Sequence, residues 1–322
     1  MSGTRYVDGV DLKGMTALRP ALAARAIALQ WAVIALAAGL AVWTRNGWVI
    51  AAAIVVIATR QHALAVLMHD GSHRLLLRDR RWNDVVSNLF LSFPILVSTA
   101  RYRAHHLAHH RYLNTERDPD LVENVAPRGA RAWALTLLAD LTAINFFRSL
   151  RSLTSFGVSG LFAGAARTDP QYAGERRLFA GFALAVALAL TAAHGLAWFA
   201  LLWLLPLITV LSAILHVRAI AEHTACENEH PLNTARTVQA NVLERALIAP
   251  CGIHYHVEHH LYPGVPFYRL GELHRTLGRR AAALGHRAHV TRGYLGRASL
   301  YAELSAHSPD QKETAASHAV HD

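Results

Sequence analysis

The sequence predicts an all-α integral membrane protein in which four transmembrane helices form two hairpins below a cytoplasmic helical cap. Apolar residues make up 53% of the 322 residues, and many of them fall in two long runs. Each run is interrupted once, near its middle, by residues that favour a turn. Arginine crowds the segments outside the runs, whereas the two turns contain only Arg45. Together these features indicate two helical hairpins with the basic segments on one side of a membrane.

The first apolar run is divided by a turn at residues 44–47, and Trp43 and Trp48 flank this turn. A helix needs about 20 apolar residues to cross the hydrocarbon core of a bilayer, and each half of the run has nearly that length. Tryptophan is common at membrane interfaces, where its ring is partly apolar and its N–H can bond with water. The predicted spans are about 25–43 and 48–68.

The second apolar run contains no charged residue from Leu178 to Val217. At about 1.5 Å per residue, a continuous helix of this length would measure roughly 60 Å, which is two bilayer thicknesses. We therefore expect a turn near His194 and Gly195, and this gives spans at 178–194 and 196–217.

Two shorter apolar pieces, 85–100 and 132–147, are expected to form interfacial or core helices rather than spans. The positive-inside rule then places both termini and all long loops in the cytoplasm. The domain prediction has three parts: a cytoplasmic tail over 1–24, a membrane domain over 25–300 and a disordered polar tail over 301–322.

Histidine is the compositional outlier, with 21 residues, and three clusters stand out. They are an HxxxH motif at 69–73 and two HxxHH motifs at 106–110 and 256–260. Side chains three or four residues apart lie on one face of a helix, with Cβ atoms about 5–6 Å apart, so two imidazoles can reach one metal ion. An HxxHH motif offers one pair at each spacing and could therefore serve two metals.

All three clusters lie outside the predicted spans on the cytoplasmic side, so they can converge on one site. His223 directly follows the fourth span and is expected at the same place. Imidazole binds Fe, Zn, Cu or Ni, so the ligand type alone leaves the metal open. The predicted metal ligands are His69, His73, His106, His109, His110, His223, His256, His259 and His260.

Carboxylates next to the clusters are candidates to accept the outer ring N–H that a metal-bound imidazole usually donates. These candidates are Asp70, Asp118, Asp120, Glu222 and Glu258. We expect His62, His105 and His194 not to bind metal. We expect the arginines beside the clusters mainly to provide the positive charge that is usual for segments on the cytoplasmic side of a membrane. Cys226 and Cys251 form no CxxC motif and predict neither a disulfide framework nor a cysteine metal site.

HxxxH followed by two HxxHH motifs across two hairpins resembles the membrane fatty acid desaturase family over roughly residues 25–280. Tyr102-Arg103, Asp118-Pro119-Asp120 and the sequence from His259 to Pro263 are similar to its bacterial members. The resemblance implies a non-haem di-iron centre held by the nine histidines, O2 as co-substrate, a fatty acyl or other lipid substrate, and a bacterial inner-membrane location. It also implies a separate electron donor, such as a ferredoxin, a rubredoxin or a b-type cytochrome.

One position departs from the family pattern. Many relatives have asparagine two residues before the third cluster, where this chain has His254. His254 is therefore a candidate for an additional metal ligand, and filling space is the alternative role.

Several alternatives fit the same sequence features. A hydroxylase or ketolase of the same architecture, acting on a fatty acid, alkane, carotenoid or sphingolipid, would have the same motifs. A histidine-rich metal transporter would place its ligands near the bilayer midplane, whereas these clusters lie outside the spans. A scaffold with a structural zinc site would need only four ligands. The net charge of +10, beside long apolar runs, favours anionic lipid or an acidic protein over nucleic acid as partner.

Overall fold

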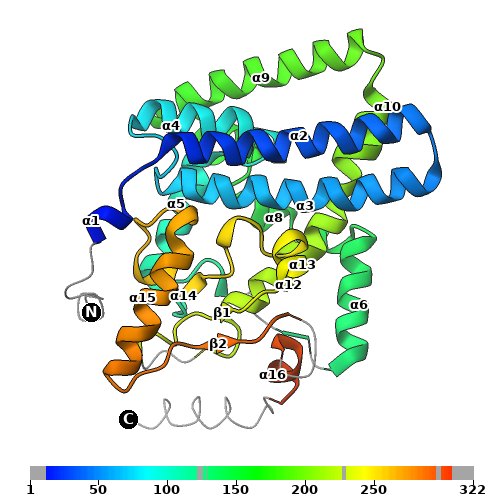
Figure 1. The fold of residues 1–322 in the computed structure, drawn as a ribbon. Coiled ribbons are helices and arrows are strands. Elements are labelled where there is room, and N and C mark those ends of the chain that lie inside the picture. The colour runs from blue at the N-terminus through cyan, green and yellow to red at the C-terminus, as the bar shows by residue number, and fades with distance from the viewer. Residues whose placement is uncertain (1–11, 122–125, 128, 227–229, 295–298, 307–322) are drawn as a thin grey trace.

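The computed structural model describes residues 12–121, 126–127, 129–226, 230–294 and 299–306, and this part of the chain is mostly helical (Figure 1). Its two longest helices, α2 (Pro20–Thr44) and α3 (Gly47–Ser72), run antiparallel and side by side. Between them, Arg45 adopts a left-handed conformation and the Asn46 side chain caps α3 by accepting from the backbone N–H groups of Trp48 and Val49. Both helices extend beyond the predicted spans, and the boundary predicted at residue 24 falls inside α2.

Helix α3 lies at the centre of the molecule. Its first half is partly exposed, whereas nearly every residue from Ile57 to Ser72 is buried. The neighbours that bury it include α2, α4 (Arg80–Ser87), α5 (Thr99–Tyr112) and α12 (Val210–His223). The HxxxH motif therefore lies at the most enclosed end of the most enclosed helix.

The second apolar run forms α9 (Ala173–Ala192), a turn, and a broken helix made of α10 (Leu196–Phe199), a π-turn (Ala200–Leu204), α11 (Leu205–Ile208) and α12. The turn falls where the sequence predicts it, with His194 in a left-handed conformation. Pro206 lies just after the π-turn and has no N–H to donate to the carbonyls of that turn. The helix breaks again after α11, where Thr209 leaves helical geometry.

Within the described chain, three helical stretches are long and apolar enough to cross a membrane: Leu12–Thr44, Gly47–Ser72 and Leu196–His223. The third predicted span, on α9, is not among them. Glu175, Arg176 and Arg177 occupy the first turn of α9, and the uncharged part that remains is shorter than a typical span.

The shorter apolar piece at 85–100 is irregular. A π-turn (Asn88–Ser92) and a 3-10 turn (Phe93–Ile95) separate α4 from α5. Trp31 and Trp203 stack with ring centroids 5.6 Å apart, and each donates its indole N–H to this segment, to the carbonyls of Phe90 and Pro94, both at 2.9 Å. The two indoles thus bond carbonyls in a stretch where the regular helical ladder is interrupted.

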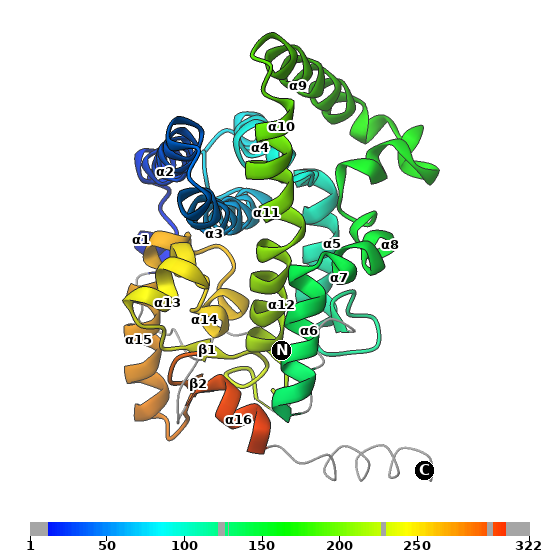
Figure 2. The ribbon, with the colours of Figure 1, turned by 90° about the vertical axis from the view of Figure 1, so that its right-hand side faces the viewer.

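The other apolar piece, 132–147, lies mostly on α6 (Gly129–Leu141) and α7 (Ile144–Arg148), and α6 packs beside α12 (Figure 2). Asp140 on α6 is buried, and the side chains of Asn145, Ser212 and His216 bond it. The remaining elements before α9 are α1 (Leu12–Met15), α8 (Leu150–Leu153) and 3-10 turns at Val158–Phe162, Gly164–Arg167 and Pro170–Tyr172.

The C-terminal third packs beneath α3 (Figure 1) and contains α13 (Val242–Leu247), α14 (His256–Leu261), α15 (Leu270–Ala283) and α16 (Leu300–Ala306). Strands β1 (Thr237–Val238) and β2 (Val290–Thr291) pair in parallel, and 3-10 turns occur at Pro250–Gly252 and Phe267–Arg269. Helix α16 extends across residue 301, where the predicted polar tail begins. Residues 307–322 of the predicted disordered tail lie outside the described residues.

Candidate metal centre

Four helices that are distant in sequence bring the three histidine clusters together. The HxxxH motif is at the C-terminal end of α3, the first HxxHH motif is on α5 and the second is on α14. His223 is the last residue of α12. Ser98 caps α5 by accepting the backbone N–H of Arg101, and the whole first HxxHH motif lies within this helix.

Five histidines form one compact group, with one ring nitrogen from each lying within 4.8 Å of the others. The Nε2 atom of His110 is 2.9 Å from that of His106 and 3.0 Å from that of His259. The group of five is His69, His73, His106, His110 and His259.

Four histidines form a second compact group under the same distance limit. The Nε2 atom of His223 lies 3.2 Å from that of His109 and 2.9 Å from that of His256, which in turn is 3.0 Å from that of His260. The two groups adjoin, since the rings of His110 and His260 have centroids 4.4 Å apart.

Each HxxHH motif serves both groups, in opposite senses. On α5, His106 and His110 join the group of five and His109 joins the group of four. On α14, His256 and His260 join the group of four, whereas His259 joins the group of five. The i, i+4 pair therefore stays together and the third histidine crosses over, a division that we did not predict from the spacing.

The packing of ring nitrogens fits metal binding. His110 faces two other Nε2 atoms, and a single ring N–H can be donated to only one of them. The same holds for His223 in the group of four. Both ring nitrogens of His69 are buried without a hydrogen-bond partner among the described residues. A metal ion that accepts the converging lone pairs would satisfy one nitrogen of each ring.

Burial lowers the pKa of several rings in the two groups and so favours their neutral form. Burial lowers the pKa of His73 to about 4, and the nearby charge of Arg103 acts in the same direction. Burial also lowers the pKa of His110 to about 3, with His73 and His109 contributing. Burial, followed by the neighbouring imidazoles, holds the pKa of four further rings well below the usual value; these are His106, His256, His259 and His260. Uncharged rings keep a lone pair free for a metal.

Of the five predicted carboxylates, Asp118 directly bonds a clustered histidine. Its Oδ1 atom lies 2.8 Å from Nδ1 of His109, and its side chain also accepts the backbone N–H groups of Asn114 and Asp120. Burial alone would raise the pKa of Asp118, but the bonds from His109 and the backbone outweigh it and hold this pKa below the usual range. Asp118 thus fixes the proton of His109 on Nδ1 and turns Nε2 toward the group.

The other four carboxylates have different main partners. Asp120 bonds His105 at 2.6 Å and lies 3.5 Å from Nδ1 of His109. Asp70 accepts the backbone N–H of Phe267.

Glu222 forms an ion pair with Arg218 at 2.6 Å, and its second oxygen is 3.5 Å from Nε2 of His256. Glu258 is 2.6 Å from both Thr237 and His274.

The other histidines considered in the sequence analysis lie outside both groups. His105 contacts Asp120 and Ser155, and His254 contacts the ring of Tyr255. His62 is buried on α3, and His194 is exposed in the turn after α9. The structure therefore does not place His254 with either group.

Two of the arginines beside the histidine clusters, which we expected mainly to follow the positive-inside rule, have partners inside the protein. Arg103 bonds Asp84 and the end of α3, and Arg218 bonds Glu222. A third arginine, Arg236, is fully buried and reaches the carbonyls of Ala221 and Thr224 on either side of His223. No local signal marks Arg236, because its partners are brought to it only by the tertiary fold.

Fold and site together define a helical protein with membrane-length helices and two adjoining histidine groups that could each hold a metal ion. The sequence model of the family described as "Fatty acid desaturase" matches residues 46–292, and the chain belongs to that family.

Two curated relatives agree with this assignment. The chain is 30% identical over 279 residues to dihydrorhizobitoxine desaturase of Bradyrhizobium elkanii, covering 80% of this chain and 76% of that protein. It is 28% identical over 257 residues to sphingolipid delta(4)-desaturase/C4-monooxygenase DES2 of Homo sapiens, covering 75% and 72%. Both relatives are named desaturases, and the chain is accordingly an oxidoreductase of this family. Membership of an enzyme family favours the oxidoreductase over the metal transporter.

Proposed function

We propose that the protein is a membrane-bound, non-haem di-iron oxidoreductase that uses O2 to desaturate a fatty acyl chain. The observation that carries the proposal is the division of nine converging histidines, six of them buried and three half-buried, into a group of five and a group of four. Two adjoining groups suit a pair of metals, whereas a structural zinc site needs only four ligands. All nine predicted ligands fall in these groups.

In this proposal the nine imidazoles hold two irons, which would supply the activation of O2 that removes hydrogen from an unactivated C–H bond. The chain contributes the geometry and the protonation state of the ligands. Burial lowers the pKa of rings such as His106 and His259, and Asp118 keeps the Nδ1 proton of His109 pointing away from the group of four. His254 stays a candidate for an additional metal ligand, which it could become through a local movement or through a bridging water molecule.

The proposed reaction balances only with an electron donor. A –CH2–CH2– unit and O2, with two electrons and two protons, give –CH=CH– and two molecules of water. The electrons would come from a separate ferredoxin, rubredoxin or b-type cytochrome. The many exposed arginines, such as Arg275 and Arg279 on α15, would favour an acidic donor.

The proposed membrane arrangement keeps four spans and two hairpins. It adds α9 to the three helices of sufficient length and apolarity, because α9 exposes Leu184 and Leu188 and ends in a turn on the same side of the molecule as the α2–α3 turn (Figure 1). Exposed leucines on a helix of this kind are typical of lipid contact. The turns at Arg45 and His194 would then lie on one side, and both termini and the histidine site on the cytoplasmic side of a bacterial inner membrane.

Hydroxylation is the second candidate. The human relative is named both desaturase and C4-monooxygenase, which supports a hydroxylated product as an outcome of the same site architecture. The two relatives are named for different substrates, dihydrorhizobitoxine and a sphingolipid, so the substrate test must include more than simple fatty acids.

Metal analysis followed by product analysis tests the proposal. Detergent-purified wild type is expected to contain about two irons per chain. His109→Ala should lose most of the iron of the group of four, and His194→Ala, at an exposed turn, should retain the wild-type content. Lipid extracts from cells that express wild type should then contain a new unsaturated or hydroxylated product that is missing with His109→Ala. Stoichiometric zinc without iron, after iron-replete expression, would overturn the proposal.

A further inference from the structure

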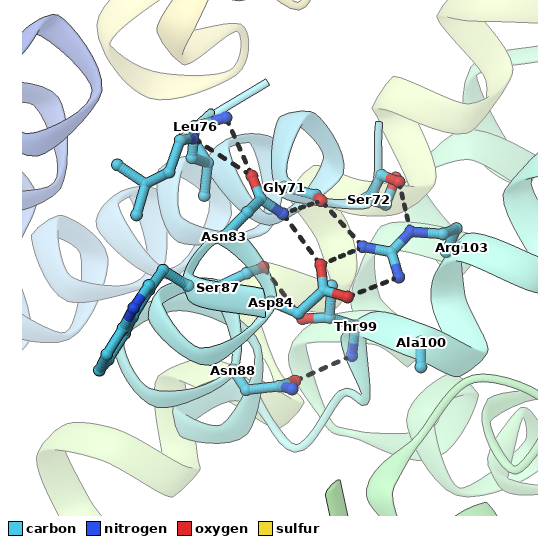
Figure 3. Close-up of polar contacts among 12 residues, drawn as sticks. Gly71, Ser72, Leu76, Asn83, Asp84, Ser87, Asn88, Thr99, Ala100 and Arg103 are labelled. Atoms are coloured by element: carbon cyan, nitrogen blue, oxygen red, sulfur yellow. Dashed lines mark hydrogen bonds and ion pairs between the residues drawn. The ribbon is translucent and has the colours of Figure 1, made fainter. Parts of the chain in front are cut away.

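A network of hydrogen bonds and an ion pair joins the end of α3 to the start of α5 through α4 (Figure 3). Arg103 is at its centre, on α5 and three residues before His106. Its Nε donates to the carbonyl of Ser72 at 2.6 Å, and its Nη2 donates to the carbonyl of Gly71 at 3.2 Å. These carbonyls belong to the last turn of α3, where the helix dipole leaves partial negative charge.

Asp84 completes the grip on Arg103. Nη1 of Arg103 donates to Oδ2 of Asp84 at 3.1 Å, and Nη2 pairs with the other carboxylate oxygen. Asn83, fully buried, donates to Asp84 at 3.0 Å and to the carbonyl of Gly71 at 2.8 Å, and its own oxygen accepts the N–H of Leu76. The guanidinium of Arg103 is therefore held on one edge by the carboxylate of Asp84 and on another by the carbonyls at the end of α3.

The same network also holds the N-terminal end of α5. The hydroxyl groups of Ser87 and Thr99 are 2.9 Å apart, and Ser92 lies 2.8 Å from Thr99. The backbone N–H of Thr99 donates to Asn88 at 3.1 Å. Thr99 is the first residue of α5, so α4 and the turn after it hold the beginning of the helix that contains the first HxxHH motif.

The two helices that Arg103 ties together supply four of the five histidines in that group. The ring of His73 on α3 has its centroid 5.0 Å from that of His106 and 5.2 Å from that of His110, both on α5. Because these rings meet across the helix interface, a small slide of α3 along α5 would change every one of their separations. The group of four takes His109 alone from these two helices.

We infer that Arg103 is a positioning residue that sets the register of α3 against α5 and thereby controls the metal position of the group of five selectively. The inference rests on the proposed metal centre. Lysine cannot replace the arginine fully, because one ammonium group cannot serve two carbonyls and a carboxylate in the fixed planar arrangement of a guanidinium.

The test compares Arg103→Met with Arg101→Met in the full-length, detergent-purified protein. Both variants remove one positive charge from the same helix, but the contacts of Arg101 are with Thr154 and Tyr172 rather than with α3. Co²⁺ serves as the spectroscopic probe, and chelator competition gives the affinity of each position. His73→Ala and His223→Ala provide the reference spectra for loss at the group of five and at the group of four.

Arg103→Met is expected to weaken one Co²⁺ position by about 10–100-fold, as other residues that orient metal ligands do. Its spectrum should match that of His73→Ala, while Arg101→Met keeps both positions and Arg103→Lys lies between. The double variant Arg103→Met/His223→Ala should have a lower Co²⁺ affinity at both positions. The double variant Arg103→Met/His73→Ala should bind Co²⁺ about as well as His73→Ala alone, because both changes act on the group of five.

Equal weakening of both positions, or unchanged binding by Arg103→Met, would overturn the inference while leaving the metal centre intact. Wild type that binds no metal through these histidines would overturn both proposals. If Arg103→Met does not fold, Asp84→Asn provides the same comparison, since it removes the counter-charge and keeps the shape of the side chain. Its expected effect is smaller but equally confined to the group of five.

Discussion

Asp118 holds the ring of His109 by a 2.8 Å contact between Oδ1 and Nδ1. Asp118→Asn should therefore lower the affinity of the group of four by about 10–100-fold, because an amide cannot enforce the same proton position on the ring. Chelator competition with Fe²⁺ or Co²⁺ measures this. Asp120→Asn is the matched control, since Asp120 is 3.5 Å from the same nitrogen and bonds mainly to His105. An equal loss in both variants would argue against the specific role of Asp118.

Gly71 in the HxxxH motif is needed for close packing. A Cβ atom there would lie 2.4 Å from Oγ and 2.9 Å from Cβ of Ser87. Gly71→Ala should reduce the free energy of unfolding by about 1–3 kcal/mol, as is common for overpacked sites. Thermal unfolding in detergent would detect this as a lower Tm.

Gly39→Ala is the control for this experiment, because Gly39 has open space around it in α2. Alanine there should be neutral or slightly stabilising, since it favours the helix. Combining Gly71→Ala with Ser87→Gly should recover part of the loss. A full Tm in Gly71→Ala alone would mean that α3 and α4 separate more easily than their packing indicates.

Glu303 predicts a pH-dependent contribution to stability. Burial alone would raise its pKa, but hydrogen bonds from His289 and Thr291 and the charge of Arg236 outweigh burial and hold the pKa far below the usual 4.5. A carboxylate with a depressed pKa in the folded state stabilises the fold above pH 4.5, and this contribution is lost as the pH falls toward the folded-state pKa. The Tm difference between wild type and Glu303→Gln should therefore be large at pH 7 and shrink below pH 4.5.

Glu272→Gln is the control for Glu303→Gln. Glu272 pairs with Arg269, but its side chain is 43% exposed, and an exposed pair of this kind adds little stability. Its Tm should stay near that of wild type at both pH values. A pH-independent Tm difference for Glu303→Gln would show that the contact depends on shape rather than charge.

The proposed topology can be tested by labelling single cysteines in a background that lacks Cys226 and Cys251. A membrane-impermeant maleimide added to cells with a permeabilised outer membrane should label Arg45→Cys and His194→Cys. It should label Arg279→Cys only after the inner membrane is opened. If His194→Cys also required this second step, α9 would not cross the membrane, and the proposal of four spans would fail.

Much of the site could be predicted from sequence because its signals are local. Histidine spacing on a helix depends on neighbouring residues alone, so the clusters at 69–73, 106–110 and 256–260 stand out without a structure. The assignment of each histidine to a group depends instead on how α3, α5, α12 and α14 cross. The same applies to the carboxylates: Asp118 follows its histidine closely along the chain, whereas Glu258 meets His274 only through the packing of α15.

The fold was predictable to a similar degree. Long apolar runs and the turn residues Asn46 and Gly195 indicate the long helices. The break after Pro206, the π-turn at 200–204 and the irregular stretch at 88–95 depend on partners elsewhere in the chain, so apolar composition does not reveal them. Arg103 shows the same limit, because its charge suggests solvent or lipid until the carbonyls of α3 are seen beside it.

The stacked Trp31 and Trp203 have a consequence for the chain between the first two histidine clusters. Unpaired backbone carbonyls normally bind water, and water inside a low-dielectric region allows ions and charged groups to enter it. Here two indole N–H groups bond the carbonyls of Phe90 and Pro94 instead. These two carbonyls are thus satisfied without solvent, so the link from α4 to α5 can stay dry at these points while it lies against the apolar helices.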